Sequence, residues 1–326
     1  MLINLEILVK KIAKKYHFQI VKKIYQAYNL ANGDSRNIIY SGFYQNKQAV
    51  LKIYNDSQLN DEPIALKIFN KINKSKILIA PQLYEYKIIS PKSGWLIMEK
   101  IPDKARHFLS PINDQEKDEF LKVFFEYRKN FSINPTRRLS LLEYLPANKF
   151  HLARINRWLE VANIREACER RLIIKPEQFI PRLNKALLFI DKEFANRKMI
   201  WCHGHVKPKE IFKVKGNLYY LTDFAHVNLY PEGYELAFII WADYLMSAPW
   251  QLGYAKWKQG INNWIDKIEQ TITKEMKIKN FRQLIRASLI ERIIGAILID
   301  ASSEDKSIQE KIGRMELLYK IFDSLI

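Results

Sequence analysis

The most informative stretch of this chain reads WCHGHVKPKEIF and covers residues 201–212. Eleven residues after its last position comes Asp223, within TDF at 222–224. Between these two segments, IFKV and LYYLTDF flank the short turn KGN, which predicts a β-hairpin inside residues 198–223. Histidine, lysine and acidic side chains are concentrated around this hairpin. We therefore expect the chemistry of the protein to lie here.

The chain before this hairpin is rich in strand patterns. Residues 22–30, 37–45 and 48–56 are dominated by β-forming residues. The turn cluster ANGDSR (31–36) separates the first two runs, and a tight turn at 46–47 separates the last two. This arrangement predicts a three-stranded antiparallel meander.

A helix and two further strands follow the meander. The segment DEPIALKIFNKINKS (61–75) has Pro63 just inside its start with acidic residues beside it, and both features suit a helix N-terminus. Three isoleucines are expected on one face of this helix: Ile64, Ile68 and Ile72. Strand patterns return at 81–89 and 94–101. Residues 22–101 therefore read β-β-β-α-β-β.

The rest of the chain is mostly helical in pattern. Helices are predicted at 113–131, 140–170, 176–196, 253–275, 279–300 and 304–325. We expect an amphipathic helix within residues 1–21, a β-rich lobe at 22–101 and a helical lobe at 102–326 that holds the hairpin. The predicted fold class is α+β: a bilobal protein-kinase-like fold with a small antiparallel β lobe carrying one helix, and a larger, mostly helical lobe.

These features resemble the aminoglycoside phosphotransferase and choline kinase branch of the protein-kinase-like superfamily. Aminoglycoside phosphotransferases have a loop H-G-D-x-x-x-x-N-I-L, then a hairpin and I-D-[FW], and protein kinases have H-R-D-x-K-P-x-N and D-F-G. This chain has HG at 203–204, KP at 207–208 and TDF at 222–224. The segment YPEGYELA (230–237) resembles the family's G-D-P-x-Y-D-L-A, with Glu235 at the position of the Asp.

The resemblance implies a site for ATP and Mg²⁺. Lys52 in AVLKIY resembles the third-strand lysine that holds the α- and β-phosphates, and Glu62 resembles its ion-pair partner on the next helix. Met98 and Glu99 resemble the hinge beside the adenine. Asp223 resembles the metal-binding aspartate.

Two loop positions depart from the family pattern. His205 stands at the position of the catalytic Asp, and Glu210 at the position of the metal-binding Asn. An imidazole can accept a proton near pH 7, but it lacks the anion, and losing a general base lowers rates about 10²–10⁴-fold. Glu210 offers hard oxygen ligands that suit Mg²⁺, and Lys207 carries a charge that could neutralise a γ-phosphate.

Three functional hypotheses follow. The favoured one is a pseudokinase or very weak phosphotransferase that binds a nucleotide, because two loop positions changed together. The second is an active ATP- and Mg²⁺-dependent phosphotransferase acting on a small molecule, with His205 and Glu210 in place of Asp and Asn. The third is a basic protein that binds nucleic acid or another polyanion on the same scaffold. The acceptor molecule or protein partner is not identified by the sequence.

A metal centre that uses the same region is a further alternative. The H-x-H pair His203 and His205, with Glu210, Asp223 and His226, has the ligand types of a zinc or iron site. The other histidines do not form the ligand-bearing βα repeat that such metallohydrolases need.

Composition bounds the remaining possibilities. The net charge of +18 attracts polyanions, but the lysines are spread over the whole chain, so nucleic acid is possible and not favoured. Apolar stretches such as LAFIIWA (236–242) are far too short for a transmembrane segment. Cys168 and Cys202 form no CxxC pair, which indicates a reducing, cytoplasmic setting.

Overall fold

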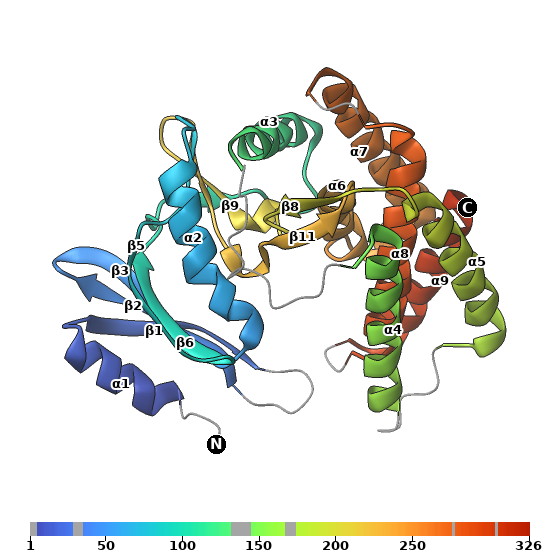
Figure 1. The fold of residues 1–326 in the computed structure, drawn as a ribbon. Helices are drawn as coiled ribbons and strands as arrows, with labels where there is room; N and C mark the ends of the chain where they lie inside the picture. The colour runs from blue at the N-terminus through green and yellow to red at the C-terminus, as the bar shows by residue number, and fades with distance from the viewer. Residues whose placement is uncertain (1–4, 29–34, 132–144, 167–173, 276–277, 304–305) are drawn as a thin grey trace. The chain divides into compact units, whose positions relative to one another are not determined.

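The computed structural model describes six ranges of the chain: residues 5–28, 35–131, 145–166, 174–275, 278–303 and 306–326 (Figure 1). Most of the predicted turn cluster ANGDSR, with its Gly33, lies outside the described residues, as does Cys168. The chain divides into two compact units. The first unit comprises residues 1–107, 126–141 and 210–228, and the second comprises residues 108–125, 142–209 and 229–326.

A five-stranded antiparallel sheet forms the centre of the first unit. Its strands are β1 (Gln19–Tyr28), β2 (Ser35–Tyr44), β3 (Lys47–Tyr54), β5 (Leu83–Ser90) and β6 (Ser93–Glu99), in the order β1-β2-β3-β6-β5. The predicted meander and the β-β-β-α-β-β order are both confirmed. The β2–β3 turn falls at Gln45 and Asn46, whose φ angles of 50° and 62° are those of a two-residue type I′ turn.

Helix α1 (Leu5–Lys15) covers one face of this sheet. The side chains of Ala49, Leu51 and Ile53 on β3 share a hydrophobic cluster with buried residues of α1, including Val9 and Ile12. Successive side chains on a strand point to opposite faces, so Lys52 points away from α1. Of the range 1–21 that was expected to hold a helix, the described residues form α1, a turn at 16–18 and the start of β1 at Gln19.

Helix α2 (Asp61–Ile72) lies on the opposite face of the sheet (Figure 1). Its buried side chains include Glu62, Leu66 and Phe69. The helix face expected to be buried carries Ile64, Ile68 and Ile72, and these side chains are only half-buried. The buried face lies one residue further along, at Ala65 and Phe69, and packs against the sheet and the 3₁₀ turn at 224–226. The face that α2 buries thus includes a carboxylate.

A small second sheet holds the predicted hairpin. Its strands, in the order β4-β10-β9-β7, are β4 (Leu78–Ile79), β10 (Leu218–Leu221), β9 (Ile211–Val214) and β7 (Arg106–His107). The 3₁₀ turns η2 (Pro208–Glu210) and η3 (Phe224–His226) bracket the hairpin, and a third 3₁₀ turn, η1 (Ser57–Asn60), precedes α2. The hairpin prediction is confirmed, and both of its outer ends carry acidic residues.

The second unit is mainly helical. Its helices are α4 (Ala147–Glu166), α5 (Pro176–Phe194), α6 (Tyr234–Ile240), α7 (Gly253–Glu275), α8 (Phe281–Ala301) and α9 (Ile308–Leu325). Helix α3 (Asp114–Asn130) spans the boundary between the units, and β8 (Met199–Cys202) pairs with β11 (Asn228–Pro231). The nearly fully buried α8 packs against α4, α5 and α9 (Figure 1). Among the described helices, none is long and apolar enough to cross a bilayer.

Candidate functional site

Lys52 and Glu62 form a buried ion pair in the first unit. The Nζ atom of Lys52 lies 2.5 Å from Oε2 of Glu62, and only 8% and 4% of the two side chains are exposed. Lys52 comes from the face of β3 opposite α1, and Glu62 comes from the first turn of α2. Two charges are held out of water only when they are paired and hydrogen-bonded, so this pair fixes α2 against β3.

Asp223 follows β10 with an unusual backbone conformation. Its φ and ψ angles are 62° and 53°, in the left-handed region that most residues avoid. This region costs most residues roughly 1–2 kcal/mol, and aspartate tolerates it better than they do. Its carboxylate is half-buried, and its Oδ2 lies 3.9 Å from Nε2 of His226. Such strain is retained where the position of a side chain matters.

Glu210 is held at the other end of the hairpin by Thr222. The Thr222 hydroxyl donates to Oε2 of Glu210 at 3.0 Å, and the Thr222 backbone N–H donates to the Glu210 carbonyl oxygen at 3.1 Å. Thr222 directly precedes Asp223. These two hydrogen bonds therefore connect Glu210 to the residue next to Asp223. This contact of Thr222 was not predicted from the sequence.

Other charged groups act on this ion pair. Burial alone lowers the pKa of Lys52, but the nearby carboxylates of Glu62 and Asp223 outweigh it and the pKa is raised. Burial raises the pKa of Glu62, and Asp223 and Glu210 add to this effect against Lys52. Asp223 and Glu210 therefore lie close enough to the pair to act on it electrostatically. A further guanidinium, that of Arg36, forms its own ion pair with Asp56.

Met98 and Glu99 lie at the end of β6. Met98 is half-buried beside Tyr54 and Leu96. The Glu99 carboxylate accepts hydrogen bonds from the Tyr220 hydroxyl at 2.9 Å and from the Gln82 backbone N–H at 3.0 Å. The side chain of Glu99 thus links β6, β10 and the residue before β5.

The loop residues predicted to be catalytic belong to the second unit. Gly204 has a φ of 78°, and its N–H donates to Oε1 of the buried Glu235 at 2.9 Å. Glu235 lies in the first turn of α6. The acidic residue at this position of the YPEGYELA segment therefore fixes the backbone one residue before His205.

His205 contacts Lys207 and an aromatic ring. Nε2 of His205 lies 3.3 Å from Nζ of Lys207, and its ring centroid lies 5.2 Å from that of Phe238. An ammonium has donors only, so Lys207 donates and Nε2 accepts. The structure thus brings together Lys52, Glu62, Asp223 and Glu210 in one unit, and His205 and Lys207 in the other.

Two solved structures are similar to this chain over nearly its whole length. Amicoumacin kinase hAmiN, in complex with AMP-PNP, Ca²⁺ and Ami, matches with a TM-score of 0.64 at 12% identity over 99% of this chain and 94% of its own. Aminoglycoside phosphotransferase APH(4)-Ia matches with a TM-score of 0.61 at 11% identity over 99% and 98%. The chain has the kinase-like phosphotransferase fold.

Choline kinase LicA from Streptococcus pneumoniae shares this kinase-like fold, with a TM-score of 0.56 at 14% identity over 98% of both chains. The structural neighbours belong to the branch that the sequence resembles, and the fold expected from that resemblance is confirmed. At the level of sequence, no family profile and no curated protein matches the chain.

The second unit of this kinase-like fold also buries a charged cluster that sequence reasoning missed. Glu291 of α8 is fully buried, 3.2 Å from a guanidinium nitrogen of Arg154 and 3.4 Å from Nδ1 of His151. The Arg292 guanidinium lies over the rings of Tyr234 at 4.4 Å and Phe238, the neighbour of His205, at 4.8 Å. The sequence carries one sign of this cluster, because the charged pair Glu291 and Arg292 interrupts the apolar run SLIERIIGAILI.

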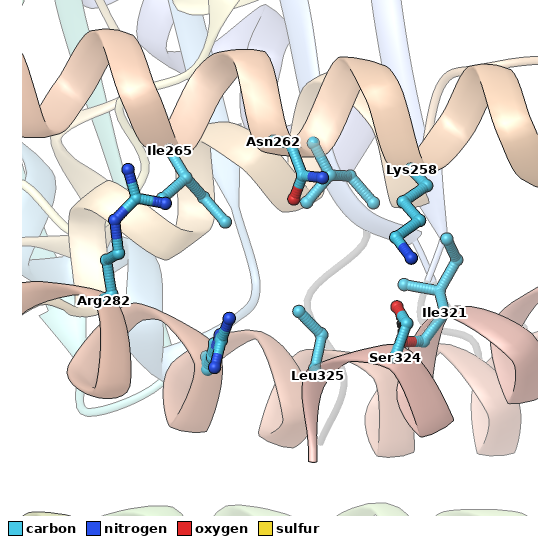
Figure 2. A pocket seen from close by; sticks show the side chains of 9 residues that line it. Lys258, Asn262, Ile265, Arg282, Ile321, Ser324 and Leu325 are labelled. Carbon is cyan, nitrogen blue, oxygen red and sulfur yellow. Dashed lines mark hydrogen bonds between the residues drawn. The ribbon is translucent and has the colours of Figure 1, made fainter.

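A cavity of about 190 Å³ lies between α7, α8 and α9 of the second unit. Figure 2 shows Lys258 from α7 and Arg282 from α8 at its edge. Arg282 is engaged by two carboxylates, those of Asp266 and Glu269, at 2.7 and 2.6 Å. None of the predicted site residues lines this cavity.

Proposed function

We propose that this chain is a nucleotide-binding protein of the kinase-like fold whose phosphoryl transfer is weak or absent. The observation that carries the proposal is the buried pair of Lys52 and Glu62 with Asp223 and Glu210 beside it. A purely structural ion pair would need no additional carboxylates, and these raise the pKa of Glu62. Clustered carboxylate oxygens beside a buried ammonium are groups that suit a divalent cation with a phosphate ligand.

The residues present suit ATP and Mg²⁺. Lys52 supplies the ammonium for the phosphates, and Asp223 and Glu210 supply oxygen ligands of the kind that Mg²⁺ prefers. Met98 and Glu99 would lie beside the adenine base of the nucleotide. When bound, Mg·ATP supplies the phosphoryl group and neutralises charge on the phosphate oxygens. The protein's part is to hold Lys52 by Glu62, and Glu210 by Thr222.

The loop favours weak transfer. Where related enzymes have an acceptor-orienting Asp, this chain has a histidine whose Nε2 accepts a hydrogen bond from Lys207. The lone pair engaged by Lys207 is the one needed to accept a proton from a substrate hydroxyl. We therefore expect a rate at least about 10²-fold below that of a loop with a working base.

An active small-molecule phosphotransferase is the second candidate. Lys52 and Asp223 are both retained, and the structural neighbours include a spectinomycin phosphotransferase in complex with ADP and spectinomycin. In this version His205 would orient the acceptor after Lys207 moves away. Turnover of ATP to ADP that depends on an added acceptor would distinguish it from the first candidate. Either version would work in the cytoplasm, where the buried free thiol of Cys202 stays reduced.

Thermal unfolding with ATP or GTP, each with and without Mg²⁺, tests nucleotide binding. A ligand that binds only the native state raises the Tm, by about 2.7 kcal/mol of stability at 100 times its Kd. We expect a rise that needs Mg²⁺, is at most about half as large in Asp223→Asn and persists in the exposed control Asp103→Asn. If no nucleotide shifts the Tm of the unaltered protein, the proposal fails.

A further inference from the structure

The cavity between α7, α8 and α9 lies entirely within the second unit, and none of the candidate-site residues lines it. Its volume of about 190 Å³ exceeds the ~150 Å³ of an engineered protein cavity that binds benzene. The cavity therefore has room for a small organic molecule with an apolar part of about six carbons.

Aliphatic side chains form walls of this cavity. Ile261 and Ile265 come from α7, and Ile321 and Leu325 come from α9. All four side chains are buried. The two residues of each pair are four positions apart, so each helix presents two aligned aliphatic groups. These walls can contact the apolar part of a ligand.

The cavity is also lined by three cations, which are Lys258 of α7 and both Arg282 and Arg286 of α8. No acidic side chain lines it. Figure 2 shows the Lys258 side chain reaching from α7 towards Ile321 and Ser324 of α9. Because charges of one sign surround the cavity, an anion inside it would be attracted from more than one side.

Neighbouring carboxylates account for only one of the three cations. Arg282 is paired with Asp266 at 2.7 Å and with Glu269 at 2.6 Å. Among the side chains that the structure describes, no carboxylate is paired with Lys258 or Arg286. Two of the three cations are therefore available to an anionic ligand.

Helix stability does not explain both of these cations. Lys258 shares the cavity with Ser324 and Leu325 of the last turn of α9, where the helix dipole favours a cation. Arg286 has no such reason. It lies four residues after Arg282 on α8, and like charges at this spacing destabilise a helix. A bound anion would offset this repulsion.

We propose that this cavity binds a small organic anion, whose charged group is attracted by Lys258 and Arg286 and whose apolar part contacts the aliphatic walls. A carboxylate and a phosphate ester share this chemistry, because both accept hydrogen bonds from ammonium and guanidinium groups. The inference does not depend on nucleotide binding, since the cavity and the candidate site have no residue in common.

Saturation-transfer NMR with the full chain, in 0.15 M sodium chloride, tests the proposal with four probes: hexanoate, acetate, hexanol and phenyl phosphate. Each buried CH₂ group strengthens binding up to about fourfold. Hexanoate should therefore bind at least about tenfold more tightly than acetate, and also more tightly than hexanol, which lacks the charge. Hexanoate and phenyl phosphate should both bind, and the tighter of the two identifies the preferred charged group.

Two cavity variants and a matched control locate the binding. Lys258→Gln with Arg286→Gln should weaken hexanoate binding about tenfold, since each exposed charged contact contributes up to about fivefold. The control, Lys256→Gln with Arg157→Gln, removes the same charge from exposed positions of α7 and α4 outside the cavity and should bind hexanoate unchanged. Ser324→Phe places a ring in the cavity and should abolish binding.

The Tm of each variant without ligand shows that it is folded. The proposal is overturned if no organic anion binds, if hexanol binds as tightly as hexanoate, or if the control loses as much affinity as the double cavity variant. Hexanoate binding that Ser324→Phe leaves unchanged would place the anion elsewhere on this basic protein and overturn the proposal as well.

Discussion

The Lys52 ammonium lies 2.5 Å from the Glu62 carboxylate in a place where less than a tenth of either side chain is exposed. Removing one member of such a pair typically costs about 3–5 kcal/mol, since the other charge is left buried. Here the two members are not equivalent, because Asp223 attracts Lys52 but repels Glu62, and Glu210 also repels Glu62. The pair is therefore expected to respond asymmetrically to substitution.

We predict that Lys52→Met lowers stability more than Glu62→Gln does at pH 7. The first change leaves the buried Glu62 without its ammonium and next to Asp223, whereas the second leaves Lys52 with Asp223. Because the pKa of Glu62 is raised, its charged form costs stability, and the deficit of Lys52→Met should shrink as the pH falls and Glu62 takes up a proton. Urea unfolding at pH 7 and pH 5 measures both effects. Equal losses at both pH values would contradict the repulsion of Glu62 by its neighbouring carboxylates.

Asp223→Asn should weaken nucleotide binding without lowering the stability of the ligand-free protein. Asparagine also tolerates the left-handed backbone at this position, and its amide removes one negative charge from the neighbourhood of Glu62. We predict stability equal to or above that of the unaltered protein without ligand. Asp223→Ala should instead be about 1 kcal/mol less stable than Asp223→Asn, because alanine lacks the local hydrogen bonds that favour this conformation. Thermal unfolding of both variants without nucleotide is the measurement.

Gly204 and Glu235 are expected to control the loop that carries His205. Gly204→Ala places a Cβ on a left-handed residue, at a cost of roughly 1–2 kcal/mol. Glu235→Gln keeps an oxygen acceptor for the Gly204 N–H but loses the charge, so we expect a smaller loss. Amide hydrogen exchange at residues 203–207 should accelerate in both variants. Unchanged exchange in Gly204→Ala would show that another contact holds the loop.

The buried Glu291 predicts sensitivity to acid. Burial would raise its pKa, but Arg154 and then His151 outweigh burial and lower it to about 2. A carboxylate with a depressed pKa contributes stability above its ordinary value of 4.5, and this contribution is lost as the pH falls towards 2. Glu291→Gln should therefore cost about 3 kcal/mol at pH 7 and much less at pH 3. The exposed Glu316→Gln serves as the control and should show no such trend.

The order of the large elements could be read from the sequence because it depends on local patterns. Alternation and turn residues mark the strands from 37 to 54, and Pro63 with its acidic neighbours marks the start of α2. The two-residue strands β4 and β7 could not be predicted, because each exists only by pairing with the distant hairpin, as Leu78 does with Tyr219. The buried face of α2 could not be predicted for the same reason, because it is set by contacts with β5 and η3.

The candidate site was likewise predictable only in part. Motif positions pointed to Lys52, Glu62, Asp223 and Glu210, which the structure brings together in one unit. The motifs could not predict how the charges of these residues act on one another, or the hydrogen bond between Lys207 and His205. Both depend on distances between side chains. The roles of these residues in binding and transfer stay predictions.

Isothermal titration calorimetry of Mg·ATP measures nucleotide binding itself. The unaltered protein, Asp223→Asn and the control Asp103→Asn would be titrated at pH 7 with and without Mg²⁺. We predict saturable binding that requires Mg²⁺, is weakened at least tenfold in Asp223→Asn and is unchanged in Asp103→Asn. Absence of binding by the unaltered protein, or equal binding by Asp223→Asn, would contradict a nucleotide site built on Lys52, Glu62 and Asp223.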